Sequence, residues 1–87
     1  MFRRVPVGIW PLLGSSPGAA CEEAIRRLLK RRSMGPVVYT AVGRGGQKRS
    51  VRLDDALYDE MRIAAEEDNV NINEFFITAL RHYVGDL

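Results

Sequence analysis

The chain has 87 residues, a formal net charge of +2, one cysteine and one histidine. A single cysteine excludes an intramolecular disulfide, and one Cys with one His cannot supply the four protein ligands of a structural zinc site. No apolar run reaches the roughly 20 residues that a membrane-spanning helix needs. A core built from so short a chain is marginal, so we expect a second copy to add stability.

The charges are divided unequally along the chain. Residues 1–53 hold eleven Lys and Arg residues and two acidic residues, a net charge of +9, whereas residues 54–87 hold two Arg and nine acidic residues, a net charge of −7. This asymmetry indicates a basic surface directed at a polyanion and an acidic remainder. The alternative is a solvated basic tail that has no partner.

Residues 1–18 are rich in Pro and Gly and show no sustained hydrophobic period, so we expect an irregular or disordered tail. Their basic start and short apolar run have some similarity to a secretory signal. Pro6 and Pro11 interrupt that run, and we therefore expect a cytoplasmic protein.

Residues 19–46 are expected to form a basic helix and a linker. Ile25, Leu28 and Leu29 share one face of a helix from Ala19 to about Ser33, and basic side chains surround that face. Gly35 and Pro36 end the helix. Residues 37–42 (VVYTAV) are rich in β-forming residues and could be a short strand, and residues 43–46 (GRGG) form a joint or turn.

Residues 47–87 form the third expected segment, which begins with a strand. In the sequence KRSVRL, the apolar Val51 and Leu53 alternate with Lys48, Ser50 and Arg52. Successive side chains of a strand point to opposite faces, so one face is apolar and the other is polar and basic. The polar face is the one that we expect to meet a partner.

Two helices follow this strand. Asp54 is placed to cap the first helix, and Asn69 suits the left-handed position after its end. Asn71 and Glu74 form a capping box for the second helix, with Asn in place of Ser or Thr. The order is therefore strand, helix, tight turn, helix.

A single strand cannot satisfy its own edges, and this leads to the expected fold class. We expect a mainly α protein with one β-strand per chain, in which two copies form an intertwined homodimer around a two-stranded antiparallel ribbon. The expected dimer core is Val51, Leu53, Leu57, Met61, Ala65, Phe75, Phe76 and Leu80.

The stretch KRSVRLDDALYDEMRIAAEEDNVNINEFFITALRHYV resembles a ribbon-helix-helix domain of the MetJ/Arc/CopG superfamily, over residues of about 47–84. The resemblance implies binding of double-stranded DNA by a β-ribbon in the major groove. It assigns base contacts to Lys48, Ser50 and Arg52. It assigns phosphate contact to the turn of Val70, Asn71 and Ile72, where a helix offers free N–H groups. Relatives often have Pro at the position of Asp54.

Two further arginines are candidates for phosphate contact: Arg44 in the glycine-rich joint and Arg49 near the start of the strand. The expected function is that of a transcriptional repressor, a homodimer that can assemble further on DNA. Two alternatives give residues 1–46 a protein partner: an antitoxin with a HicB-like C-terminal part, and a plasmid or phage segregation adaptor whose basic tail contacts a ParA-like ATPase. No nucleophile–base pair or phosphate-binding loop is visible, so we expect no enzyme, cofactor or metal.

Overall fold

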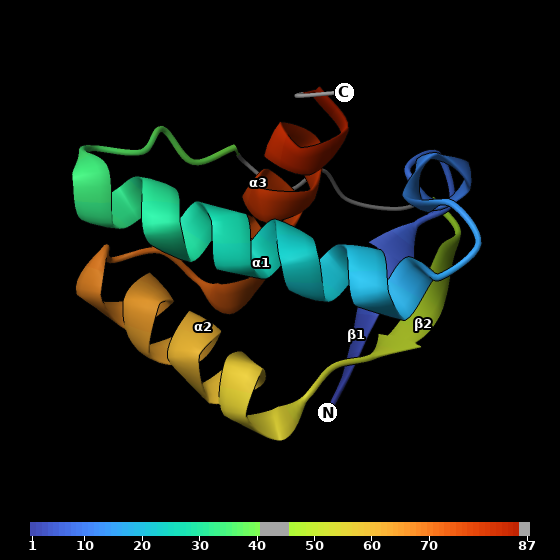
Figure 1. Ribbon diagram of the computed structural model, residues 1–87, viewed down its shortest axis with the longest axis horizontal. Coiled ribbons are helices and arrows are strands. Elements are labelled where there is room, and N and C mark those ends of the chain that lie inside the picture. The colour runs from blue at the N-terminus through green and yellow to red at the C-terminus, as the bar shows by residue number, and fades with distance from the viewer. Residues whose placement is uncertain (41–45, 86–87) are drawn as a thin grey trace.

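The computed structural model describes residues 1–40 and 46–85, and the chain is α+β in class. A two-stranded antiparallel sheet lies at one end of the molecule, and α1 lies across α2 and α3 (Figure 1). The elements in chain order are β1 (Phe2–Pro6), the 3-10 helix η1 (Trp10–Leu13), α1 (Pro17–Met34), β2 (Lys48–Arg52), α2 (Asp55–Glu67) and α3 (Ile72–Gly85).

The N-terminal segment is the main difference from expectation. Residues expected to be irregular form β1 and η1, and β1 pairs with β2 along its full length. The ladder continues beyond both strand ends, because Leu53 N donates to Met1 O at 2.7 Å and Val7 N donates to Gln47 O at 3.0 Å. These bonds fix the register of the two strands at both ends.

Residues 1–40 and 46–85 therefore contain two strands where the expected fold class had one per chain. The ribbon is antiparallel, as expected, but its second strand comes from the same chain. The argument for an intertwined homodimer rested on an unpaired strand, and β1 now occupies that edge of β2. A ribbon made from two copies of β2 would require β1 to leave.

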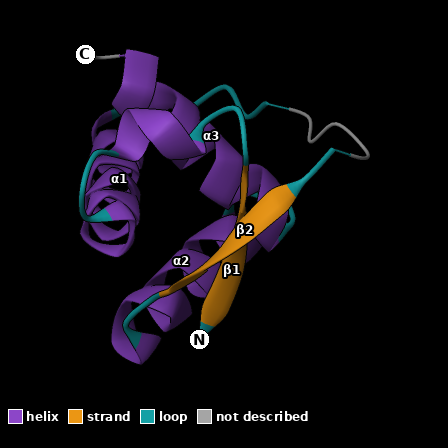
Figure 2. Ribbon diagram, turned by 90° about the vertical axis from the view of Figure 1, so that its right-hand side faces the viewer, coloured by secondary structure: helices purple, strands orange, loops and turns teal. Residues whose placement is uncertain are grey.

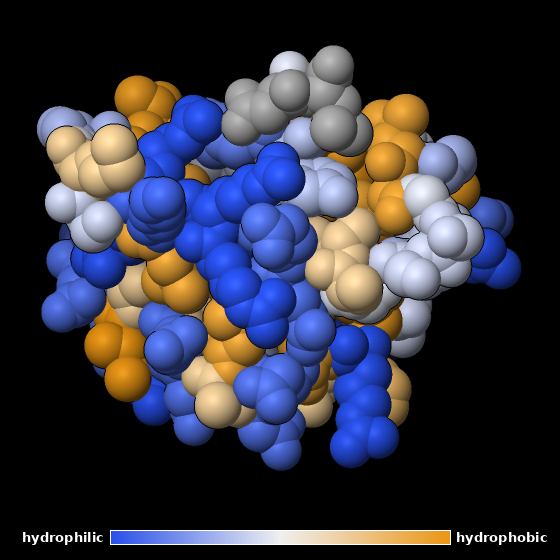
Figure 3. Space-filling model, in the orientation of Figure 1, coloured by the Kyte–Doolittle hydropathy of each residue, from blue (hydrophilic) through white to orange (hydrophobic). Residues whose placement is uncertain are grey.

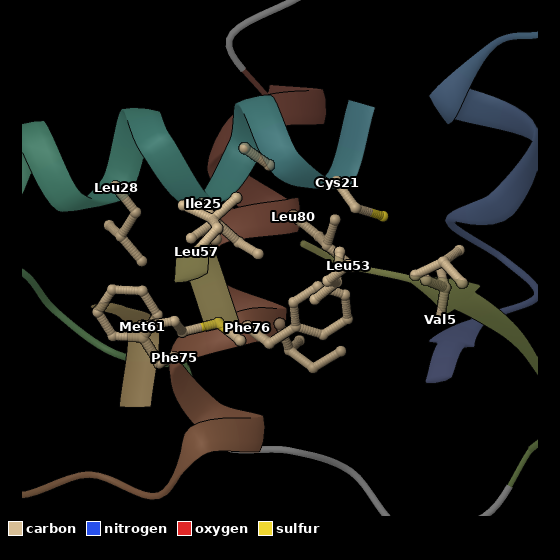
Figure 4. Packing of buried hydrophobic residues seen from close by; sticks show 14 of the residues in the cluster. Val5, Cys21, Ile25, Leu28, Leu53, Leu57, Met61, Phe75, Phe76 and Leu80 are labelled. Carbon is tan, nitrogen blue, oxygen red and sulfur yellow. The ribbon is translucent and has the colours of Figure 1, made fainter. Parts of the chain in front are cut away.

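Helix α1 covers much of the apolar surface that a second copy was expected to cover. It begins with Pro17 at its first position, where the missing N–H costs nothing. Ile25 and Leu28 point from α1 toward side chains of α2 and α3 (Figure 4). All eight residues of the expected dimer core are buried, with at most 5% of their surface exposed, within this one chain. A single core thus joins residues from all three expected segments.

The caps predicted for α2 and α3 are confirmed. Asp54 Oδ2 accepts a hydrogen bond from Leu57 N at 3.1 Å, which satisfies one free N–H of α2. Helix α2 ends at Glu67, and Asn69, which follows the C-cap Asp68, has the predicted left-handed conformation with a φ of 57°. Asn71 Oδ1 accepts from Glu74 N at 2.8 Å, and Glu74 Oε1 accepts from Asn71 N at 3.4 Å, which is the predicted capping box.

The segment after α1 does not form the strand suggested by its β-rich sequence. Residues 37–40 are irregular, and residues 41–42 lie outside the described residues. Thr40 N donates to the buried Thr78 Oγ1 at 2.9 Å, and the rings of Tyr39 and Phe75 lie 5.8 Å apart. These contacts attach the chain to α3. Within the described residues, no helix combines the length and hydropathy that a membrane span requires.

Candidate nucleic-acid interface

The polar face of β2 points away from the core, as its alternation predicted. Lys48, Ser50 and Arg52 are exposed. By contrast, only 5% of the Val51 surface and 1% of the Leu53 surface are accessible to solvent. Figure 2 shows both strands in front of the helices, so that one face of the ribbon is uncovered. The three residues expected to contact bases therefore lie together on an open surface.

Strand β1 completes this surface. Residues directly opposite each other in an antiparallel pair share a face, and Pro6, Arg4 and Phe2 lie opposite Lys48, Ser50 and Arg52 respectively. Their shared surface, which we call the outer ribbon face, consists of Phe2, Arg4, Pro6, Lys48, Ser50 and Arg52. Arg4 is exposed, and Phe2 keeps 66% of its surface exposed.

Sequence analysis missed Arg4 and Phe2. Their strand has five residues, of which only Arg3 and Val5 face the core, and Val5 alone is fully buried. One buried residue gives too short an alternation to stand out beside Pro6 and the glycine that follows. The available signal was Val5 within a short run of basic and aromatic residues.

The electrostatics of the outer ribbon face differ between its two ends. Within the described residues, the side chains of Arg4, Lys48 and Arg52 form no hydrogen bond or ion pair. Beyond Arg52, the terminal ammonium of Met1 donates to Asp55 Oδ1 at 2.9 Å. This contact is the main reason why the pKa of Asp55 lies below its ordinary value, and Arg52 adds a smaller attraction. The face is therefore basic along the strands, with a carboxylate near its Arg52 end.

Arg49 lies on the other face of the ribbon. It is opposite the buried Val5, and its guanidinium carbon lies 5.2 Å from the centre of the Trp10 ring. This distance is within the range of a cation–π contact. The structure therefore does not group Arg49 with Lys48, Ser50 and Arg52, although its side chain remains exposed. Arg44, the other predicted phosphate contact, lies outside the described residues.

The turn of Val70, Asn71 and Ile72 is also separate from the ribbon. It follows the 13 residues of α2, and that helix runs away from β2 over about 20 Å (Figure 1). The capping box uses the N–H groups of Asn71 and Glu74. The first N–H groups of the helix, those of Ile72 and Asn73, have no intrahelical acceptor. Phosphate contact at this turn stays a prediction.

A second basic surface lies on α1. Figure 3 shows hydrophilic side chains across the middle of the face on which α1 lies in Figure 1. Several of these cations already have partners: Arg27 bonds Glu23 at 3.2 Å and lies 5.0 Å from the Tyr83 ring, and Arg31 lies 3.0 Å from His82 Nδ1. The charge of this surface is therefore partly engaged within the molecule.

Neither metal-binding geometry nor a known relative adds to this description. Across residues 1–40 and 46–85, no group of three or more His, Cys, Asp or Glu side chains is placed to hold a metal ion. Comparison of the chain with family models, with curated proteins and with solved structures finds no match.

Proposed function

We propose that this chain binds double-stranded DNA through the outer ribbon face, and that it does so as a transcriptional repressor. One observation supports this most: an antiparallel ribbon presents Arg4, Lys48, Ser50 and Arg52 on one uncovered face. A two-stranded ribbon fits the major groove of B-DNA, where polar side chains contact base edges. The ribbon-helix-helix resemblance of residues 47–84 supports the same assignment.

Each side chain has a contact suited to its chemistry. The burial of Val51 and Leu53 fixes which face of β2 meets the core, so the Arg52 side chain points away from the core. An Arg in this position can form two hydrogen bonds to guanine O6 and N7, and Ser50 can bond several bases. Lys48 lies at the end of the ribbon, where an ammonium can contact phosphate as a point charge. Arg4 adds a second guanidinium from the other strand.

In this proposal the DNA-binding unit is one chain. The ribbon is complete without a second copy, and β1 differs in sequence from β2. A homodimer with an exchanged ribbon, as the resemblance implies, would have to break the β1–β2 ladder in both copies. We therefore propose that a second copy, where present on DNA, binds beside the first and does not complete its ribbon.

The two alternatives that involve a protein partner receive less support. The segregation adaptor needs a mobile tail before the DNA-binding domain, but residues 2–6 are paired with β2. The antitoxin needs residues 1–46 as a toxin-binding element. Val5 and Ile25 from that part share one core with Phe75, so the described residues form no separate module there.

The proposal is tested by Arg52→Ala against a matched control, Arg62→Ala. Arg62 is an exposed arginine of α2 that pairs with Glu66 at 3.2 Å, away from the outer ribbon face. Binding to a selected duplex and to its scrambled version is measured across a salt series. We expect Arg52→Ala to lose about 1–3 kcal/mol of discrimination and Arg62→Ala to keep it. Equal weakening of both duplexes by Arg52→Ala would contradict the proposed base contact.

A further inference from the structure

A hollow lies beside the end of the ribbon at which Pro6 pairs with Lys48. Its volume is about 540 Å³, and it is lined by Val7, Trp10, Pro11, Gln47, Lys48 and Arg49. It adjoins η1, which lies next to this end of the two strands in Figure 1. The hollow shares Lys48 with the outer ribbon face, but Arg49, which also lines it, belongs to the opposite face of β2.

The walls of the hollow are fixed by backbone hydrogen bonds. Val7 N donates to Gln47 O at 3.0 Å, so the two strands stay joined beyond their last paired residues. Ile9 N donates to Pro6 O at 3.0 Å, which turns the chain into η1. Trp10 packs against the core from η1, and Leu13 of the same element is buried. The ring is therefore held in place rather than free on a loop.

The lining combines a flat aromatic ring with two cations. The Arg49 guanidinium lies over the Trp10 ring at 5.2 Å, and Lys48 lines the same hollow. Trp10 is half-buried, so part of its surface faces solvent. A nucleotide is a flat ring joined to an anion, and proteins bind unpaired bases by stacking them on aromatic rings and on Arg guanidinium planes. An acidic peptide would use the two cations but would leave the aromatic ring without a stacking partner.

We propose that this hollow binds an unpaired nucleotide of a nucleic-acid strand. The base packs against the Trp10 ring and the Arg49 guanidinium, and the phosphate contacts Lys48. This inference extends the proposed DNA-binding function, since the hollow would take a base that leaves the duplex beside the outer ribbon face. The two sites share Lys48, but the hollow also depends on Trp10 and Arg49, which are not part of the outer ribbon face, so the two proposals can fail separately.

Trp10 reports on this site directly because it is the only tryptophan of the chain. The full chain is titrated with a single-stranded hexanucleotide that carries a fluorescent label, and both tryptophan emission and label anisotropy are measured. We expect saturable quenching of Trp10 emission. We expect Arg49→Gln to weaken binding about tenfold, because it removes one stacking plane and one charge. The control Arg62→Gln removes an exposed charge of α2 that belongs neither to the hollow nor to the outer ribbon face, and it should change this affinity less than twofold.

Two substitutions of the ring itself separate stacking from charge. Trp10→Phe keeps an aromatic plane and should retain most of the anisotropy response, whereas Trp10→Leu should lose it. Circular dichroism melts show whether each variant is folded. If Trp10→Leu does not fold, the comparison of Trp10→Phe with Arg49→Gln tests the site instead. Absence of quenching, or equal weakening by Arg49→Gln and Arg62→Gln, would overturn the assignment of the hollow. Intact duplex discrimination in the same preparation would show that the proposed function stands without it.

Discussion

Arg4 and Ser50 lie directly opposite each other across the antiparallel ribbon of a single chain. The two residues are separated by most of the N-terminal half of the sequence, yet the ladder places them on the same exposed face. Deleting β1 would therefore remove one of the two strands of the sheet and, with it, half of the residues of the outer ribbon face.

The first prediction concerns the attachment of β1 to the core. Val5 is completely buried, so Val5→Asp should place an uncompensated charge in the core and cost several kcal/mol. Val7 keeps 41% of its surface exposed, so Val7→Asp serves as the matched control and should change stability little. Urea denaturation followed by circular dichroism measures both. Equal midpoints for the two variants would show that β1 does not contribute to the folded state.

The second prediction concerns the carboxylate that joins α1 to the α2–α3 turn. Arg32 Nε donates to Asp68 Oδ2 at 3.0 Å, Arg32 Nη2 donates to Oδ1 at 3.0 Å, and the Tyr39 hydroxyl donates to the same carboxylate. The hydrogen bonds from Arg32 are the main reason why the pKa of Asp68 falls to about 2. Asp68→Asn should therefore lower the free energy of unfolding by about 1–2 kcal/mol at pH 7.

This carboxylate also predicts a pH dependence. A carboxyl whose pKa is lowered on folding stabilises the native state above its unfolded pKa, and that contribution is lost as the pH falls through the folded pKa. The stability that Asp68 contributes should thus decline from about pH 4 to about pH 2. Chemical denaturation across this range should show a shallower decline for Asp68→Asn than for the control Glu66→Gln, which alters an exposed pair with Arg62. Parallel curves would argue against the contact.

The third prediction concerns Cys21. Its side chain is buried, and burial is the main reason why the pKa of the thiol rises to about 12, with repulsion from Glu22 second. The thiolate is the reactive form, so the folded chain should resist a thiol reagent at pH 8 and react only through unfolding. Adding Ser15→Cys, at an exposed position, supplies a thiol that should react at once. Rapid labelling of Cys21 at native conditions would contradict its buried position.

Local signals explain what the sequence predicted correctly. The direction of Lys48, Ser50 and Arg52 followed from the alternation with Val51 and Leu53. Hydrogen bonds between residues three apart cap the N-termini of α2 and α3. Asp54 and the Asn71–Glu74 pair could therefore be recognised as caps without knowing the fold. These features require no information from distant parts of the chain.

Non-local pairing explains what was missed. Whether a short segment forms a strand depends on the neighbour with which it pairs, and the partner of β1 lies more than forty residues further along the chain. The sequence around Val5 gave one buried position beside Pro6, too little to predict a strand. The contact between Trp10 and Arg49 depends on the same pairing, and so does the presence of Arg4 on the outer ribbon face.

The symmetry of the bound DNA tests the central claim most directly. Double-stranded DNA from a random pool is selected on the full chain, the enriched motif is sequenced, and the complex is weighed by analytical ultracentrifugation. A ribbon of two different strands should select an asymmetric motif that one chain of 9.8 kDa occupies. A ribbon shared by two copies mirrors its two-fold symmetry in the site. A palindromic motif bound by two chains, of which an isolated half-site binds no single chain, would therefore contradict the single-chain ribbon. A pool without enrichment would contradict sequence-specific DNA binding itself.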